Sequence, residues 1–423
     1  MLFVVAYMVN ICTAIALIQE KWLPLHLVKT AIIGGGAAGF FLAVNLKEMV
    51  PEMEVTVFER HQRVLAKVEI SGGGRCNCTN SFDGVGDLSV VYPRGHRLMK
   101  RLLHVFSQHD AYQWFERHGV HLTTQDDCCV FPASQDSHTI INCFLYECRR
   151  LGVIVRTGQS IMSLEQLADY DFKVITVGGQ PRRESLLWLE SAGHTIEPPV
   201  PSLFTVRIDD PQLNSLMGTV VDDVVTMIPG TKFRAEGPLL LTHWGMSGPS
   251  VLRLSSYAAR HLAEHNYCVA LAVNWTKRHD TEMLDELSAI VARHQQKQLS
   301  TIRPADLPAR LWSYLIYKWL GERAHAPWGS LNRKELNRLA NLLSGGDQYQ
   351  VAGRAAFKDE FVTCGGISLS SVNPSTLESR TVPGLYFSGE VLDVDGITGG
   401  FNFQVAWTTA YTVATSIAGR AKV

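Results

Sequence analysis

Three glycines near the start of the chain have the spacing of a turn that binds dinucleotides. Gly34, Gly36 and Gly39 follow the apolar run 30–33 and fit the pattern G-x-G-x-x-G. In such a turn the first glycine permits a sharp bend, the second lets the backbone approach a pyrophosphate, and the third lets the helix pack on the strand. The N–H groups and dipole at the helix start favour phosphate charge. We expect a bound dinucleotide here rather than an ordinary strand–helix turn.

An acidic residue at the end of a second apolar run supports this interpretation. Glu59 follows the run Val55–Phe58 and lies twenty residues after Gly39. A carboxylate at this place can accept hydrogen bonds from both hydroxyls of an adenosine ribose, and it would repel a 2′-phosphate.

The segment 71–80 is unusually rich in small and polar residues. Its three consecutive glycines, 72–74, are costly to order and supply no packing, so they make sense where backbone passes close to a ligand. Arg75 could pair with a phosphate and Asn77 could hydrogen-bond a ring or a ribose. The alternative is a surface turn stabilised by an arginine.

A third candidate segment spans residues 384–402. A short apolar strand leads to Gly389 and Glu390, an acidic turn follows, and Gly399-Gly400 open a final helix. N–H groups at that start could receive a pyrophosphate or a flavin carbonyl, and Asp393 could bind a ribityl hydroxyl. A metal site from these acids lacks a fuller ligand set, so we predict none.

The segment 242–249 contains His243, a possible acid–base residue. A lone histidine is more often structural, so a catalytic role for His243 is the lesser alternative.

The secondary structure that must position these residues is expected to differ between parts of the chain. Strand–helix alternation over 29–199 predicts a mostly parallel sheet covered by helices. The segment 200–280 is β-rich, with strands expected at 204–208, 220–227, 239–241 and 267–273, and 281–345 is helical. We therefore predict an α/β fold in which a two-part Rossmann-like domain, 29–199 and 359–423, is interrupted by an insertion at 200–358.

The amino-acid composition limits the classes of protein to which the chain can belong. The chain has 423 residues, 46% of them hydrophobic and 19% charged, which indicates a globular protein of two or three domains. A net charge of −1 without a long basic run argues against nucleic acid as a partner. Nine scattered cysteines, with no C-x-x-C pair and no zinc spacing, favour reduced thiols in the cytoplasm. The C-x-C pair Cys76 and Cys78 is expected to pack rather than to exchange electrons.

The N-terminal residues 1–28 form an apolar extension. Met1–Ile18 has a length at the threshold for a membrane span, but the first basic residue is Lys21, so a signal peptide is a poor match. We favour an upstream extension over a membrane anchor.

Together, the segments 34–39, 71–80, 239–249 and 384–402 resemble the YhiN/BaiN-like family of flavoproteins, which are NAD(P)/FAD-dependent oxidoreductases. The resemblance runs from residue 29 to 419. It implies an FAD-binding domain interrupted by a β-barrel-like and helical insertion. It also implies cofactor contacts from Gly34, Gly36, Ala38, Gly39, Glu59, Arg60, Lys67, Ser71, Gly72, Gly73, Gly74, Arg75, Cys76, Asn77, Ile161, Gly178, Gly179, Gly389, Glu390, Asp393, Gly399, Gly400, Phe401 and Asn402.

Three segments depart from the family's usual pattern. Cys128-Cys129 stand where Gly-Arg is usual, 180–185 lacks the usual glycines, and Ala66-Lys67 replace Gly-Arg-Lys. None of the three departures falls in a core FAD motif. They therefore concern substrate binding rather than cofactor binding.

The resemblance implies hydride transfer through flavin N5 to or from a small organic substrate. With no second G-x-G-x-x-G, NAD(P)H would bind only transiently. The resemblance covers both reduction of conjugated enones and oxidation of amines, and the sequence does not choose between them; a small organic acceptor such as a conjugated enone is one expectation. An amine-type oxidase and a non-catalytic or RNA-modification-associated flavoprotein stay open as alternatives.

Overall fold

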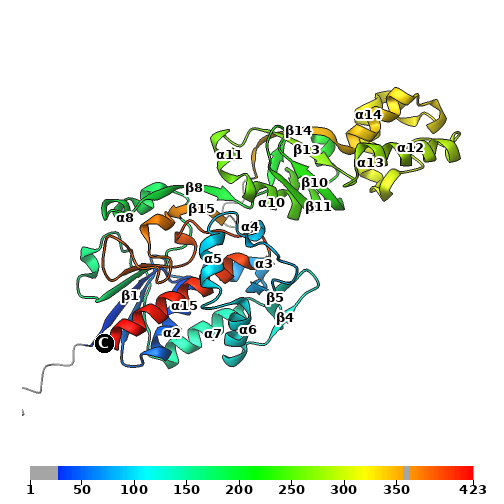
Figure 1. Cartoon of the computed structure of the whole chain (residues 1–423). Coiled ribbons are helices and arrows are strands. Elements are labelled where there is room, and N and C mark those ends of the chain that lie inside the picture. Colours follow the sequence, from blue (N-terminus) through cyan, green and yellow to red (C-terminus); the bar gives the residue numbers. More distant parts are fainter. Residues whose placement is uncertain (1–26, 356–361, 423) are drawn as a thin grey trace, which may run out of the picture.

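The computed structural model describes residues 27–355 and 362–422 of the chain (Figure 1). The predicted apolar segment Met1–Ile18 and the predicted boundary at 358/359 lie outside these residues. Within the described ranges, none of the helices is long and apolar enough to cross a bilayer.

A five-stranded parallel sheet forms the centre of the first domain, with the strand order β16-β7-β1-β2-β6. Each neighbouring pair is parallel, as the strand–helix alternation predicted. The edge strand β16 comes from the C-terminal part of the chain, so residues after the insertion complete the sheet. The strands are β1 (Lys29–Ile33), β2 (Glu54–Phe58), β6 (Ile154–Arg156), β7 (Phe172–Ile175) and β16 (Leu385–Phe387).

Two long helices from opposite ends of the chain pack against each other beside this sheet. Figure 1 shows α2 (Ala37–Met49) next to α15 (Phe401–Ala421), and the two are in extensive contact. Phe41 of α2 and Trp407 of α15 are both fully buried, with ring centroids 5.2 Å apart. Because α2 is covered on several sides, it is apolar almost all round and lacks an amphipathic pattern.

The remaining elements of this domain surround the core. They are α3 (Ala66–Gly74), β3 (Thr79–Asn80), α4 (Leu88–Val91), α5 (His96–Leu102), α6 (Gln108–Arg117), β4 (Leu122–Thr124), β5 (Cys129–Pro132), α7 (His138–Arg150) and α8 (Leu187–Ser191).

The insertion is a closed antiparallel barrel with the strand order β10-β11-β12-β9-β14-β13. Two of its strands, β12 and β14, were not predicted. β14 alternates buried and exposed residues, but two glycines follow its first residue, Ser344, and weaken the strand signal. The strands are β9 (Val206–Ile208), β10 (Val220–Met227), β11 (Arg234–Thr242), β12 (Gly245–Ser247), β13 (Ala270–Asn274) and β14 (Ser344–Arg354).

The insertion also contains helices, which lie beside the barrel and at one of its ends. Between β11 and β13 lie α10 (Pro249–Tyr257) and α11 (Ala259–Glu264), while the short α9 (Pro211–Asn214) follows β9. The three longest, α12 (Asp280–His294), α13 (Ala309–Leu320) and α14 (Arg333–Leu343), lie between β13 and β14. Figure 1 shows these three at the end of the barrel remote from the parallel sheet.

The insertion is reached through a two-stranded antiparallel ribbon, β8 (Ile196–Ser202) with β15 (Val362–Ile367). Two arginines that pair with aspartates connect the domains beside it. Arg94 pairs with Asp395 and also donates to the carbonyl of Ser256 in α10, and Arg260 of α11 pairs with Asp393. The chain is therefore an α/β protein whose two-part Rossmann-type domain is interrupted by a barrel and helices. The boundaries at 199/200 and 358/359 stay predictions, and the first of them falls inside β8.

Candidate functional site

A cavity of about 840 Å³ lies at the carboxyl ends of the parallel strands, where ligands bind in open α/β sheets. Its walls come from the turns that follow β1, β2, β7 and β16 and from α3. The sheet domain alone does not enclose it, because residues of the insertion line it too.

The three glycines of the first turn are surrounded differently. A Cβ on Gly34 would lie 2.4 Å from the carbonyl oxygen of Thr176, and one on Gly39 would lie 2.1 Å from that of Gly34. A Cβ on Gly36 would have no protein atom within 4 Å. Gly34 and Gly39 are therefore required for packing, whereas Gly36 leaves open space at the cavity wall.

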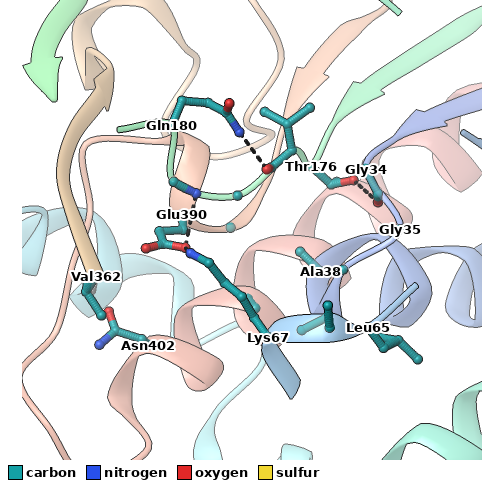
Figure 2. Close-up of a pocket in the computed structure, with 18 of the residues that line it drawn as sticks. Gly34, Gly35, Ala38, Leu65, Lys67, Thr176, Gln180, Val362, Glu390 and Asn402 are labelled. Atoms are coloured by element: carbon teal, nitrogen blue, oxygen red, sulfur yellow. Dashed lines mark hydrogen bonds and ion pairs between the residues drawn. The ribbon is translucent and has the colours of Figure 1, made fainter. Parts of the chain in front are cut away.

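The start of α2 fits the pyrophosphate of a dinucleotide. Gly36 is its N-cap, no side chain caps the first turn, and no acidic residue lies in that turn. The first N–H groups are thus unopposed by carboxylates and lie beside the open space at Gly36. Thr176 Oγ1 holds the turn by donating to the Gly34 carbonyl over 2.8 Å (Figure 2).

Glu59 is fixed at the cavity wall by backbone groups. Its Oε2 accepts from Gly35 N–H and its Oε1 from His61 N–H, both over 2.9 Å. The carboxylate is thereby oriented in two places, with no cationic partner side chain among residues 27–355 and 362–422, and each oxygen keeps lone-pair capacity for another donor. The adenosine ribose role of Glu59 stays a prediction, and the geometry is compatible with it.

Glu59→Ala is expected to weaken FAD binding about 10- to 100-fold, because the ribose loses a charge-assisted acceptor. The measurement is the dissociation constant of FAD for the apoprotein, from quenching of flavin fluorescence. Glu52→Ala, at an exposed glutamate before the same strand, is the control. Unchanged affinity in Glu59→Ala would refute the ribose assignment.

A charged pair crosses the cavity wall and joins both halves of the domain. Lys67 Nζ donates to Glu390 Oε2 over 2.8 Å (Figure 2). Glu390 also accepts from the N–H groups of Gly179 and Thr363, each over 3.0 Å. Burial by itself would raise the pKa of Glu390, but Lys67 and these N–H groups outweigh it and hold the pKa below its ordinary value. The Glu390 carboxylate therefore stays ionised at neutral pH, and its ion pair holds Lys67 Nζ at the cavity wall.

The insertion supplies a mainly apolar wall with two hydroxyls. Leu203, Phe204 and Leu252 line the cavity together with Thr205 and Ser247, whose hydroxyl oxygens are 2.8 Å apart. Sequence reasoning missed these residues except that Ser247 lies in the segment 242–249. The space they border lies between the Rossmann-type domain and the barrel.

Most predicted cofactor residues line this one cavity. They are Gly34, Gly36, Ala38, Glu59, Arg60, Lys67, Ser71, Gly72, Gly73, Ile161, Gly178, Gly179, Gly389, Glu390 and Asn402. Nine others do not line it: Gly39, Gly74, Arg75, Cys76, Asn77, Asp393, Gly399, Gly400 and Phe401.

Two of those nine have charged side chains that are used elsewhere. Asp393 accepts two hydrogen bonds from Arg260, at 2.9 and 2.8 Å, so its carboxylate contacts the insertion. The guanidinium of Arg75 lies 4.3 Å from the ring centre of Phe131 and donates to Gln135. The ribityl role of Asp393 and the phosphate role of Arg75 stay predictions, which these contacts do not support.

The glycine pair before α15 serves packing. A Cβ on Gly400 would lie 2.1 Å from the carbonyl oxygen of Thr79, and Asn80 Nδ2 donates to the Gly399 carbonyl over 2.9 Å. With its amide oriented to satisfy its neighbours, Asn77 accepts from Gly400 N–H and donates to the Thr79 carbonyl. These contacts form a layer behind the cavity wall, and Asn402 is the next residue along that lines it.

The segment 71–80 is not a plain loop. Its glycines belong to α3, which breaks at Ser71–Gly73, where Gly72 and Gly73 take φ of 57° and 68°. A Cβ on Gly73 would meet no protein atom within 4 Å. The break therefore exposes bare backbone to the cavity, which a side chain would obstruct.

Cys76 and Cys78 are buried and unreactive. Burial raises the pKa of Cys76 to about 12 and that of Cys78 well above its ordinary value. We expect iodoacetamide to label the exposed Cys268 in the native protein long before either of them, as peptide mass spectrometry would report. Rapid labelling of Cys76 would contradict its packing role.

His243 is exposed and contacts Trp244, with ring centroids 4.8 Å apart, and it does not line the cavity. An acid–base role for His243 stays a prediction that its position outside the cavity lining does not support.

Comparisons with known proteins place the chain in a family. The sequence model of the HI0933-like protein Rossmann domain matches residues 28–416. The chain is 27% identical over 425 residues to the 3-dehydro-bile acid delta(4,6)-reductase of Clostridium scindens, covering 93% of this chain and 98% of that protein. It is 29% identical over 406 residues to the ribosomal RNA dihydrouridine synthase of Escherichia coli, covering 90% and 96%.

Among solved structures, the 3-ketosteroid delta1-dehydrogenase of Sterolibacterium denitrificans shares the fold, with a TM-score of 0.50 at 10% identity. The match covers 92% of this chain and 99% of that one. Because the family model spans nearly all of the described residues, the chain belongs to the HI0933-like Rossmann-domain family and is an FAD-dependent oxidoreductase.

Proposed function

We propose that the protein reduces a C=C bond conjugated to a carbonyl group in a small organic substrate, with NAD(P)H as the electron donor. The observation that carries the proposal is the nearly full-length similarity to the bile acid reductase. The cavity supports it, since it continues from the glycine turn to an apolar wall from the insertion.

The reaction is a two-electron reduction. A hydride equivalent adds to the carbon β to the carbonyl, electron density moves onto the carbonyl oxygen, and a proton from solvent adds to the α-carbon. FAD, when bound, supplies the redox chemistry by accepting a hydride equivalent from NAD(P)H and delivering it at N5.

The chain's own residues bind and orient the reactants. Gly36 and the start of α2 would hold the pyrophosphate, and Glu59 the adenosine ribose. The Thr205–Ser247 pair uses one of its two O–H groups internally, so the other is free to donate to a substrate carbonyl. Leu203, Phe204 and Leu252 would exclude water from the apolar body of the substrate.

A uridine in ribosomal RNA is the second candidate substrate, favoured by the relatives named as ribosomal RNA dihydrouridine synthases in Escherichia coli and Haemophilus influenzae. The C5=C6 bond of uracil is also conjugated to a carbonyl, so the chemistry is the same. A net charge of −1 favours the small substrate. We also propose a cytoplasmic location, since the cysteines of the described residues are all free thiols.

The decisive experiment follows the flavin band of the purified protein under anaerobic conditions. We expect NADH or NADPH to bleach it, and a 3-oxo-4-ene steroid to restore it. Restoration only by an rRNA transcript would establish the second candidate instead. Bleaching by amines but not by NAD(P)H would overturn the proposal in favour of an oxidase.

A further inference from the structure

We propose that α11 and the residue after it form a binding site for a divalent transition metal ion of the zinc class, outside the flavin cavity. The ligands are His261, Glu264 and His265. Each offers one donor atom, and these atoms lie within 4.8 Å of one another. The spacing i, i+3 and i+4 places the three side chains on one helical face.

The hydrogen bonding of His265 prepares it to bind a metal. Its Nδ1 lies 2.8 Å from the carbonyl oxygen of His261. A carbonyl can only accept, so Nδ1 carries the proton and Nε2 keeps its lone pair for a metal. Metal-binding histidines usually have this second bond, because it fixes both tautomer and ring orientation.

His261 is also restrained before any ion binds. Its ring is half-buried, lies 5.6 Å from that of Phe233, and lies 4.2 Å from that of His265. Two imidazoles held this close cost little further side-chain entropy when a metal joins them.

Charge distinguishes this cluster from a similar one. Glu48, His118 and Glu147 also bring donor atoms within 4.8 Å of one another, but Arg150 pairs with both carboxylates, so a cation already neutralises them. Glu264 forms no ion pair with an arginine or lysine of residues 27–355 and 362–422. Its carboxylate charge remains available to an ion.

The donor set selects the class of ion. Two imidazole nitrogens and one carboxylate suit Zn²⁺, with water in the fourth position, whereas Ca²⁺ and Mg²⁺ prefer oxygen ligands throughout. None of the three residues lines the flavin cavity, so the site does not depend on the proposed reaction.

The position suggests what a bound ion would do. Arg260, the neighbour of His261, pairs with Asp393 of the Rossmann-type domain, and α11 contacts the ribbon strand β8 (Figure 1). An ion bound to residues in successive turns would stabilise α11, the helix whose Arg260 contacts the Rossmann-type domain. Its role is structural.

The test is a calorimetric titration of the untagged holoprotein with ZnCl₂ at pH 7.5. We expect one saturable site per chain, at least tenfold weaker in His265→Ala and several-fold weaker in Glu264→Gln. His243→Ala, at an exposed histidine of the same domain, should leave the affinity unchanged. Zn²⁺ should also raise the melting temperature of the wild type but not of His265→Ala.

One further variant tests whether the thiol of Cys268, rather than the proposed ligands, binds the ion. Cys268 is exposed, and its N–H donates to the His265 carbonyl over 3.0 Å, so Cys268→Ser must keep the site for the proposal to stand. Loss of binding in that variant, equal affinity in His265→Ala, or no saturable binding would each overturn it.

Discussion

Gly36→Ala should yield a folded protein that no longer retains FAD, whereas Gly39→Ala should damage the fold itself. The added methyl group at position 36 points into open space with φ of −93°, which alanine adopts readily. The cost to folding is therefore about 1 kcal/mol or less. The same group occupies the space where a pyrophosphate would approach the backbone, and we expect FAD affinity to fall about 100-fold or more.

At position 39 the methyl group meets backbone rather than space. It would lie 2.1 Å from the Gly34 carbonyl oxygen, so the strand–turn–helix unit must shift, at a cost of about 3 kcal/mol. Flavin absorbance after purification and urea unfolding of the apoproteins separate the two effects. Full flavin occupancy in Gly36→Ala would contradict the placement of the pyrophosphate.

Asp395→Asn is expected to destabilise the protein by about 3–5 kcal/mol. The Asp395 side chain is fully buried and that of Arg94 is 11% exposed, so the substitution leaves a guanidinium charge without its counter-ion. Arg94 Nη1 also donates to the Ser256 carbonyl over 2.5 Å, and Ser202 donates to Asp395. The damage should therefore include the junction with the insertion.

Asp393→Asn is the matched control, two residues away. Its partner Arg260 is 43% exposed, and exposed pairs contribute about 1 kcal/mol at most. The midpoint of urea unfolding should fall far more in Asp395→Asn than in Asp393→Asn. A double variant, Arg94→Met with Asp395→Leu, should recover part of the loss because no buried charge remains. Equal effects of the two single substitutions would contradict a special role for the buried pair.

Local sequence patterns predicted much of the first domain. The glycine spacing at 34–39 and the apolar runs of β1 and β2 are properties of short segments, and so is the alternation of strands and helices over 29–199. Composition shifts and the family resemblance predicted the interrupting barrel and helices, and the closed barrel confirms that part of the fold class.

Side-chain partners far apart in sequence were not predictable in the same way. Asp393 follows a cofactor-like motif, yet its partner Arg260 lies 133 residues away on the insertion, and only the docking of the two domains brings them together. Leu203, Phe204 and Thr205 carry no motif of their own, and they become cavity residues because the barrel closes over the sheet.

The sequence by itself determined the glycine turn and the acidic residue after β2, because spacing and periodicity act over a few residues. Composition shifts along the chain also indicated the two-part organisation. Only the tertiary structure decided which predicted residues face the cavity and which pack behind it. Gly36 and Gly400 illustrate the difference: both begin a long helix, but one borders open space and the other abuts the Thr79 carbonyl, a neighbour that is set by contacts across the whole chain.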